Sequence, residues 1–225
     1  KFKNFSFGVP TGSTVRGIEV SLGGLSEAVP VAANTVNLYP TFAGAPNSNS
    51  WTGTTTTNGQ KVVAMGNSDA DFSYLSSGTN NASQVFVIQN AALPSGATIN
   101  SVTLYAVARY TTAGATLKLR VENANNTASA TSPVITPAST YGTISWTMNV
   151  NPLTGVAWTG TDVTSWPLRF GVMKSNLNVA RITQLYAVVN YSYTPISLAP
   201  VKVDMSFNNG TNWSTSSTAM LPDTD

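Results

Sequence analysis

The sequence predicts an all-β protein, made of jelly-roll or Ig-like antiparallel β-sandwich modules in tandem. Three observations support this fold class. Many short segments alternate apolar and polar residues, turn-forming Gly, Pro and Asn separate them, and one twelve-residue phrase occurs twice. Period-two segments bounded by turn residues are typical of strands, and many short strands are typical of a sandwich. No segment has a convincing helical period.

The repeated phrase is VPTGSTVRGIEV at residues 9–20 and LPSGATINSVTL at residues 93–104. Pro and Gly two residues apart predict a turn, because Pro fixes φ near −65° and Gly tolerates positive φ. Apolar and polar residues alternate after the turn, so each phrase should lead from a turn into a strand. We expect four side chains of these strands to point into apolar cores: Ile18, Val20, Val102 and Leu104.

Strand signals continue along the chain at short spacing. We predict strands at residues 4–9, 14–22, 35–39, 61–65, 84–89, 98–110, 115–122, 141–149, 168–173, 179–193 and 201–207. The clearest is 115–122, where Leu117, Leu119 and Val121 should face inward. The charged residues that alternate with them, Lys118, Arg120 and Glu122, should face solvent. In 179–193 both faces are apolar, which predicts a central or covered strand.

Two stretches divide the predicted strands into parts. Residues 42–59 contain few core residues and resemble a linker or long loop, and Pro195 and Pro200 mark a second seam. Beyond it, Asn209-Gly210 predicts the turn of a β-hairpin. We therefore expect a partial module with linker at 1–49, a complete sandwich at 50–194, and the start of a further module at 195–225. In the alternative, 1–49 adds strands to the central sandwich.

Composition excludes several classes of function. Only 9% of residues are charged, against about 25% in an average domain, and the net charge of +2 forms no basic stripe, which argues against nucleic acid as a partner. The chain has no His and no Cys, so catalytic triads, imidazole zinc sites and disulfides are excluded. We expect no enzyme. Apolar runs such as 185–189 are far too short to span a membrane.

A set of motifs in a fixed order carries a resemblance to a known family. The motifs are DADFSYL (69–75), LPSGATINSVTLYAVARY (93–110), NPLTGVAWTGTDV (151–163), FGV (170–172) and RITQLYAVVNYSY (181–193). Their order is similar to jelly-roll-like β-sandwich modules repeated in large bacterial surface proteins and phage tail or fibre proteins. The C-terminal GTNWS resembles hairpins of Ig-like or sugar-binding surface modules. The resemblance implies display or adhesion, and it transfers no catalytic residue.

Two groups of residues are candidates for ligand binding. Asn67, Asp69 and Asp71 place side-chain oxygens at alternate positions, as a calcium site requires, and calcium is the one cofactor we consider. Alternatively, these side chains cap a polar turn. Trp51 and Trp213 lie in loop-like or hairpin settings, so we expect them to be exposed, where they could stack on sugars. Trp146 and Trp158 are expected to fill the core.

These observations favour a non-enzymatic, extracellular structural or adhesive protein. We expect a subunit or segment of a surface filament, appendage or phage fibre, located outside the cell, on the cell surface or on the virion. Its partners would be copies of itself or adjoining β-modules of a longer chain, joined through strand edges, with glycans as a further partner. The alternative is a carbohydrate-binding module of a secreted multidomain protein. We also expect the chain to belong to a longer chain or polymer, because the C-terminal hairpin alone buries little.

Overall fold

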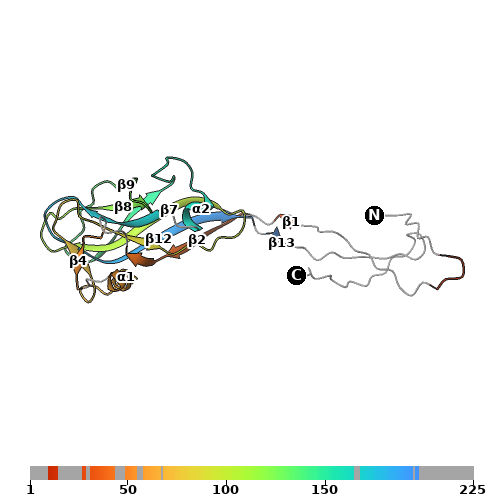
Figure 1. Cartoon of the computed structure of the whole chain (residues 1–225), viewed down its shortest axis with the longest axis horizontal. Helices are drawn as coiled ribbons and strands as arrows, with labels where there is room; N and C mark the ends of the chain where they lie inside the picture. Colours follow the sequence, from red (N-terminus) through yellow and green to blue (C-terminus); the bar gives the residue numbers. More distant parts are fainter. Residues whose placement is uncertain are drawn as a thin grey trace. The chain divides into compact units, whose positions relative to one another are not determined.

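The computed structural model describes residues 10–14, 27–28, 31–43, 49–54, 58–66, 68–164, 168–194 and 196–197 (Figure 1). The chain divides into two compact units. The smaller unit combines Lys1–Pro30 with Pro195–Asp225, and the larger unit is Val31–Thr194. The two terminal segments, which the sequence assigns to separate modules, therefore belong to one unit. In that unit β1 (Glu27–Ala28) pairs antiparallel with β13 (Ile196–Ser197). The predicted hairpin at Asn209-Gly210 lies outside the described residues.

The repeated phrase folds into the same turn in both units. The amide of Ser13 donates to the carbonyl of Pro10 at 3.1 Å, and the amide of Ala97 donates to the carbonyl of Pro94 at 3.1 Å. The third residue of each turn is a glycine with positive φ, 89° at Gly12 and 75° at Gly96. A side chain would disfavour that conformation, which explains the shared glycine.

The strand that should follow each turn is confirmed only for the second phrase. There β7 (Thr98–Tyr110) begins directly after the turn, and Val102 and Leu104 are fully buried. Ile18 and Val20 lie outside the described residues. The structure thus confirms the repeated turn but leaves the repeated strand a prediction.

The larger unit consists of two antiparallel sheets, which confirms the all-β sandwich. One sheet has six strands in the order β10-β7-β12-β5-β4, with β2 also paired to β12, and the other has five in the order β3-β6-β11-β8-β9. The strands not yet placed are β2 (Ala32–Leu38), β3 (Pro40–Ala43), β4 (Thr52–Gly53), β5 (Leu75–Ser77), β6 (Ser83–Ile88), β8 (Leu117–Asn123), β9 (Ser129–Thr131), β10 (Gly142–Met148), β11 (Leu168–Lys174) and β12 (Ala180–Tyr193).

Alternation determines which side of each strand faces the core. In β8, Leu117, Leu119 and Val121 are fully buried, as predicted. The opposite face of β8 is less open than expected, because Glu122 is also fully buried. β12 is the central strand of its sheet, with β7 along one edge and both β2 and β5 along the other. Its apolar residues on both faces fit this central position.

The prediction that residues 61–65 form a strand, and that the chain has no helix, is wrong. Those residues lie in α1 (Asn58–Gly66), which contacts β3 and β12 and is drawn at the lower left of Figure 1. On β12, β5 pairs with residues 180–182 and β2 with 187–193, which leaves the edge between them open. Beside that gap, the side-chain amide of Gln184 donates through Nε2 to the backbone carbonyl of Gly66 at 3.5 Å. A second, short helix is α2 (Gly160–Thr164).

The N-terminal boundary of the sandwich differs from the sequence-based one at residue 50. Strand β2 pairs with β12, and β3 pairs with β6, so residues 31–43 supply one strand to each sheet. The stretch expected to be a linker, 42–59, includes β4 and the start of α1. For residues 31–43, the structure therefore agrees with the alternative in which the N-terminal part adds strands to the central sandwich. Within the described residues, no helix is long and apolar enough to cross a membrane.

Candidate functional site

A group of charged side chains lies on the outer face of the six-stranded sheet. Arg109 of β7 and Arg181 of β12 are direct cross-strand partners, and Ser76 of β5 follows Arg181 in the same row. Like charges directly opposite one another on a sheet repel and destabilise it. The row therefore needs a negative charge beside it.

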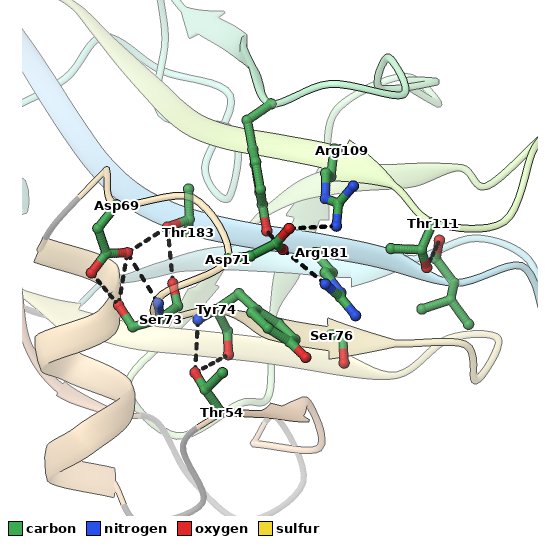
Figure 2. Close-up of polar contacts among 12 residues, drawn as sticks. Thr54, Asp69, Asp71, Ser73, Tyr74, Ser76, Arg109, Thr111, Arg181 and Thr183 are labelled. Atoms are coloured by element: carbon green, nitrogen blue, oxygen red, sulfur yellow. Dashed lines mark hydrogen bonds and ion pairs between the residues drawn. The ribbon is translucent and has the colours of Figure 1, made fainter.

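Asp71 supplies that charge from the loop before β5. Its Oδ2 lies 2.7 Å from Nη2 of Arg109, and its Oδ1 lies 2.8 Å from Nη1 of Arg181. Figure 2 shows its carboxylate between the two guanidinium groups. The hydroxyl of Tyr141 also donates to Oδ1, at 2.9 Å. One carboxylate thus bridges two arginines that would otherwise face each other unscreened. We call Asp71, Arg109, Arg181, Tyr74 and Tyr141 the arginine–tyrosine cluster.

Two tyrosine rings enclose the guanidinium groups of the cluster. The guanidinium carbon of Arg181 lies 4.0 Å from the ring centroid of Tyr74, and that of Arg109 lies 5.1 Å from the ring centroid of Tyr141. Both distances are within the range of cation–π attraction. The rings restrict the arginines to positions from which they reach Asp71. The side chain of Asp71 itself stays 51% exposed.

Asp69 has a different role from Asp71, although only Ala70 separates them. Oδ1 of Asp69 accepts from the amide of Ser73 at 3.2 Å, and its Oδ2 lies 2.8 Å from the hydroxyl of Ser73. The hydroxyl of Thr183, at a bulge in β12, lies 3.0 Å from Oδ1. Figure 2 shows these contacts on the side of the loop away from the arginines. Asp69 therefore anchors the loop to β12.

The loop between the two aspartates is tightly turned. Ala70 has a φ of 59°, in the left-handed region that a residue with a side chain rarely adopts, and the amide of Phe72 donates to the carbonyl of Asp69 at 3.2 Å. Such a conformation persists only where surrounding contacts enforce it, and it is often found at functional sites. Here the bonds of Asp69 and Asp71 hold the turn from both sides.

The protonation states of the cluster follow from these contacts. The hydrogen bond from Arg181 is the main reason that the pKa of Asp71 lies below its ordinary value. Burial raises the pKa of Tyr141 to about 12, and the bond to the Asp71 carboxylate adds to this rise. Partial burial raises the pKa of Asp69, but hydrogen bonds from Ser73 and Thr183 outweigh it and lower the pKa overall. At neutral pH both aspartates are ionised and Tyr141 is a neutral donor.

This arrangement suits hydrogen bonding to a ligand better than proton transfer. The cluster carries two positive charges and one negative charge, and its ionised carboxylate is partly accessible. A carboxylate, guanidinium groups and aromatic rings side by side are groups that bind polyhydroxylated or weakly acidic molecules. Neither aspartate has a raised pKa that would make it a general acid at neutral pH.

The calcium prediction stays a prediction. Asn67 lies outside the described residues, and Asp69 and Asp71 make hydrogen bonds to different partners. In the part of the chain that the structure describes, no three His, Cys, Asp or Glu side chains gather as metal ligands would. The two guanidinium groups beside Asp71 would repel a divalent cation there. The polar-turn alternative for Asp69 agrees with its bonds to Ser73.

The expectation that Trp51 is exposed is wrong. Its side chain is fully buried in the core, and its Nε1 donates to the carbonyl of Ala82 at 2.9 Å. A ring without an accessible face cannot stack on a sugar. The polar residues around Trp51 suggested a loop, but the tryptophan directly precedes β4, which pairs with β5. Trp213 lies outside the described residues, and Trp158 fills the core as predicted.

A second aromatic feature lies on the same outer face. The rings of Tyr105 and Tyr186, partners across β7 and β12, stack with centroids 4.9 Å apart and planes 10° apart. Tyr39 extends the row, with its centroid 6.1 Å from that of Tyr186. Because the rings cover one another, they present fewer free faces than three separate tyrosines would.

Sequence reasoning missed Arg109, Arg181, Tyr74 and Tyr141. The two arginines are far apart in the sequence, and only the register of β7 against β12 makes them neighbours. The available signal was that few charged residues occur, yet two of them, Arg109 and Arg181, lie within predicted strands, and Arg109 directly precedes Tyr110. A comparison with protein-family models and with curated proteins gives no match for this chain.

Proposed function

We propose that this chain is a non-enzymatic structural or adhesive β-sandwich module of an extracellular assembly, joined to its neighbours through strand edges. The observation that carries the proposal is the open edge of the six-stranded sheet at β10. Within the described residues β10 pairs with β7 alone, and its outward side chains Thr143, Ser145 and Thr147 are exposed.

The chemistry of this edge supports assembly. Soluble proteins protect exposed edge strands with charged side chains, proline or bulges, because unpaired amides and carbonyls recruit other strands. β10 has none of these: its sequence is GTISWTM, and its register with β7 is continuous. No charged residue occurs between Glu122 and Asp162. An edge of this length without protection is expected to be kept free for a partner.

The finer description follows the sequence resemblance. The module would be of the jelly-roll type, repeated in tandem within a surface filament, appendage or phage fibre, and located outside the cell or on a virion. Low charge, the absence of cysteine and outer strand faces rich in Thr, Ser and Asn support this setting. The turn shared by residues 10–13 and 94–97 supports the tandem arrangement.

Electron microscopy of the purified full chain tests this proposal. We expect particles larger than one chain that become more abundant and more regular as the protein concentration rises. Isolated single-chain particles at the highest concentration that stays soluble would contradict it. A variant with a charged residue on an exposed edge strand serves as the comparison, since it should shift the population toward single chains.

Glycan binding is the second candidate function, and the arginine–tyrosine cluster favours it. Asp71, Arg109 and Arg181 offer acceptors and donors beside the ring of Tyr74, as sugar hydroxyl groups require. Calorimetric titration with neutral and uronate-containing oligosaccharides tests it. We expect binding that Asp71→Ala abolishes and that Lys118→Gln, on the other sheet, leaves unchanged. If the unaltered chain binds neither kind of glycan, this candidate fails.

A further inference from the structure

We propose that two copies of this chain pair through β10, antiparallel about a two-fold axis at Ser145, so that the six-stranded sheet of one copy continues into the other. This inference deepens the proposed function, on which it rests, by naming the edge, its partner and its register.

The backbone amides and carbonyls along β10 alternate between two directions, one toward β7 and one away from it. The amide of Tyr110 donates to Ala138, ahead of β10, whereas the amide of Thr111 donates to Val179, ahead of β12. Even-numbered residues of β7 therefore direct their backbone groups toward β10, and odd-numbered residues direct theirs toward β12. Across the register, the β10 residues that bond to β7 are Gly142, Ile144, Trp146 and Met148.

The remaining residues of β10 face away from β7. Thr143, Ser145 and Thr147 direct their amides and carbonyls to the open edge, and their side chains are exposed on the outer face. The contact between Thr103 and Thr147 agrees with this assignment. Their hydroxyls lie 3.0 Å apart, and side chains come closest in the non-hydrogen-bonded pairs of an antiparallel ladder.

The length of β10 determines the register in which two copies can pair. β10 spans Gly142–Met148, so Ser145 is its midpoint. Only an axis at Ser145 pairs the whole strand with its copy, placing Ser145 opposite Ser145 and Thr143 opposite Thr147. In each of these outward residues, the backbone amide would then donate a hydrogen bond to the second copy, and the backbone carbonyl would accept one from it. Every contact occurs twice, as in any two-fold interface.

The side chains on both faces of β10 are compatible with this register. In this register Ile144 of one copy faces Trp146 of the other on the core side of the sheet. Both residues pack against the core yet remain partly accessible at the edge. An aromatic ring beside a β-branched side chain is a favourable cross-strand pair. Pairing would cover both apolar residues, while the outer face would place only hydroxyl side chains opposite one another.

A second copy of β10 fits this edge better than other occupants because the edge is uncharged and matches itself. A charged peptide would find no complementary charge between Glu122 and Asp162. The competing arrangement is a head-to-tail contact with β2, which lies on the far side of β12 in the same sheet. There Thr35 is the exposed outward residue at the middle of the strand. The experiment must separate these two arrangements.

Engineered cysteines test the register directly, because the chain contains no cysteine of its own. Opposite residues in a hydrogen-bonded antiparallel pair have Cα atoms about 5.5 Å apart, which a disulfide can span. Ser145→Cys alone should therefore form dimers under mild oxidation. Thr143→Cys or Thr147→Cys alone should not, since each residue lies about 14 Å along the strand from its own copy. A mixture of those two variants should form dimers.

Charge exchange at the axis provides the second readout. Ser145→Lys and Ser145→Glu should each weaken dimerisation about fivefold, and an equal mixture should restore it, because opposite charges then face each other. Circular dichroism should show an unchanged fold, since the side chain of Ser145 is exposed. Thr35→Lys on β2 is the matched control and should leave dimerisation unchanged.

The outcomes separate this inference from the proposed function. If the chain associates but Ser145→Cys gives no dimer, or if Thr35→Lys weakens association as strongly as Ser145→Lys, the β10 pairing is wrong and assembly proceeds through another edge. If the unaltered chain does not associate at any concentration, both proposals fail. A disulfide from Thr143→Cys alone would show a different register and would also overturn the axis at Ser145.

Discussion

At the residue scale, Asp71 determines how two arginines coexist on one sheet face. Its carboxylate contacts Arg109 at 2.7 Å and Arg181 at 2.8 Å, and the pKa of Asp71 is lowered mainly by the bond from Arg181. A carboxyl with a lowered folded-state pKa stabilises the fold above its ordinary value of 3.8, and this contribution is lost as the pH falls through the lowered pKa. The cluster should therefore weaken in acid.

The variant Asp71→Asn tests this account. We expect it to unfold at lower urea concentration than the unaltered chain at neutral pH, because the two arginines lose their shared negative charge. The difference should shrink as the pH falls from 3.8 through the lowered pKa of the folded chain, because the Asp71 carboxyl then becomes neutral as well. Urea unfolding followed by tryptophan fluorescence measures both values. A difference that is the same at neutral and acid pH would show that charge is not the cause.

Lys174 should make the stability of the fold depend on pH at the alkaline end of the range. It is fully buried at the end of β11, and its Nζ donates to the carbonyl of Thr116 at 2.6 Å and to Oδ1 of Asn176 at 3.1 Å. Burial lowers the pKa of Lys174 to about 8 from its ordinary 10.5. Between these values the unfolded chain holds a proton that the folded chain has released, so stability should rise with pH across this window.

The test compares the free energy of unfolding at the two ends of that window. In Lys174→Met, the part of the rise in unfolding free energy that comes from this lysine should disappear. The control variant Lys118→Met, on the outer face of β8, should keep the full rise. Other groups that titrate in the window contribute equally to all three chains. An unchanged pH slope in Lys174→Met would mean that this lysine stays protonated when folded.

At the element scale, β11 depends on a close approach that only glycine permits. A Cβ at Gly171 would overlap the backbone carbonyl oxygen of Gln84 on the neighbouring strand β6. We expect Gly171→Ala to destabilise the fold by about 1–3 kcal/mol or more, because the two central strands would have to separate.

Gly142 on β10 is the matched control for Gly171. A Cβ there would meet no atom within 4 Å, so Gly142→Ala should be neutral or stabilise slightly, by about 0.5–1 kcal/mol. Thermal and urea unfolding measure the change in stability that each of the two substitutions causes. If both substitutions cost the same, the close contact between β6 and β11 is not what requires glycine.

The long elements were the ones that the sequence could predict. β7 matches its predicted bounds, and β8, β10, β11 and β12 match within a few residues, because their alternation extends over many positions. Helix α1 was missed since its buried face, Lys61, Ala64 and Met65, begins with a charged residue. The amine of Lys61 is held inside by Oδ1 of Asn49 at 2.7 Å, a contact that no local pattern reveals.

The short elements and the site could not be predicted for a different reason. β4, β5 and β9 have two or three residues each, which is too short for a periodic signal. The site requires the register of β7 with β12, and Trp51 requires knowledge that its neighbours pair with β5. Both depend on long-range pairing. Local spacing singled out Asp69 and Asp71 as candidate calcium ligands, but it did not reveal the side chains that they contact.

At the scale of the whole molecule, a chain with only 9% charged residues has an open sheet edge at β10 within the described residues. Few charged side chains are available to block edge-to-edge pairing, and β10 carries none. The two-fold contact through β10 closes at two copies, so a filament would need a second contact elsewhere on the chain. Each backbone hydrogen bond contributes only about 1 kcal/mol net, so the association should depend on concentration.

The mass of the full chain in solution, measured by sedimentation equilibrium over a series of concentrations, tests assembly through strand edges most directly. One chain has a mass of 23.5 kDa. We predict that the average mass rises above this value as concentration increases, and that Ser145→Lys delays the rise while Thr35→Lys does not. A constant mass of 23.5 kDa at every concentration would contradict assembly through strand edges.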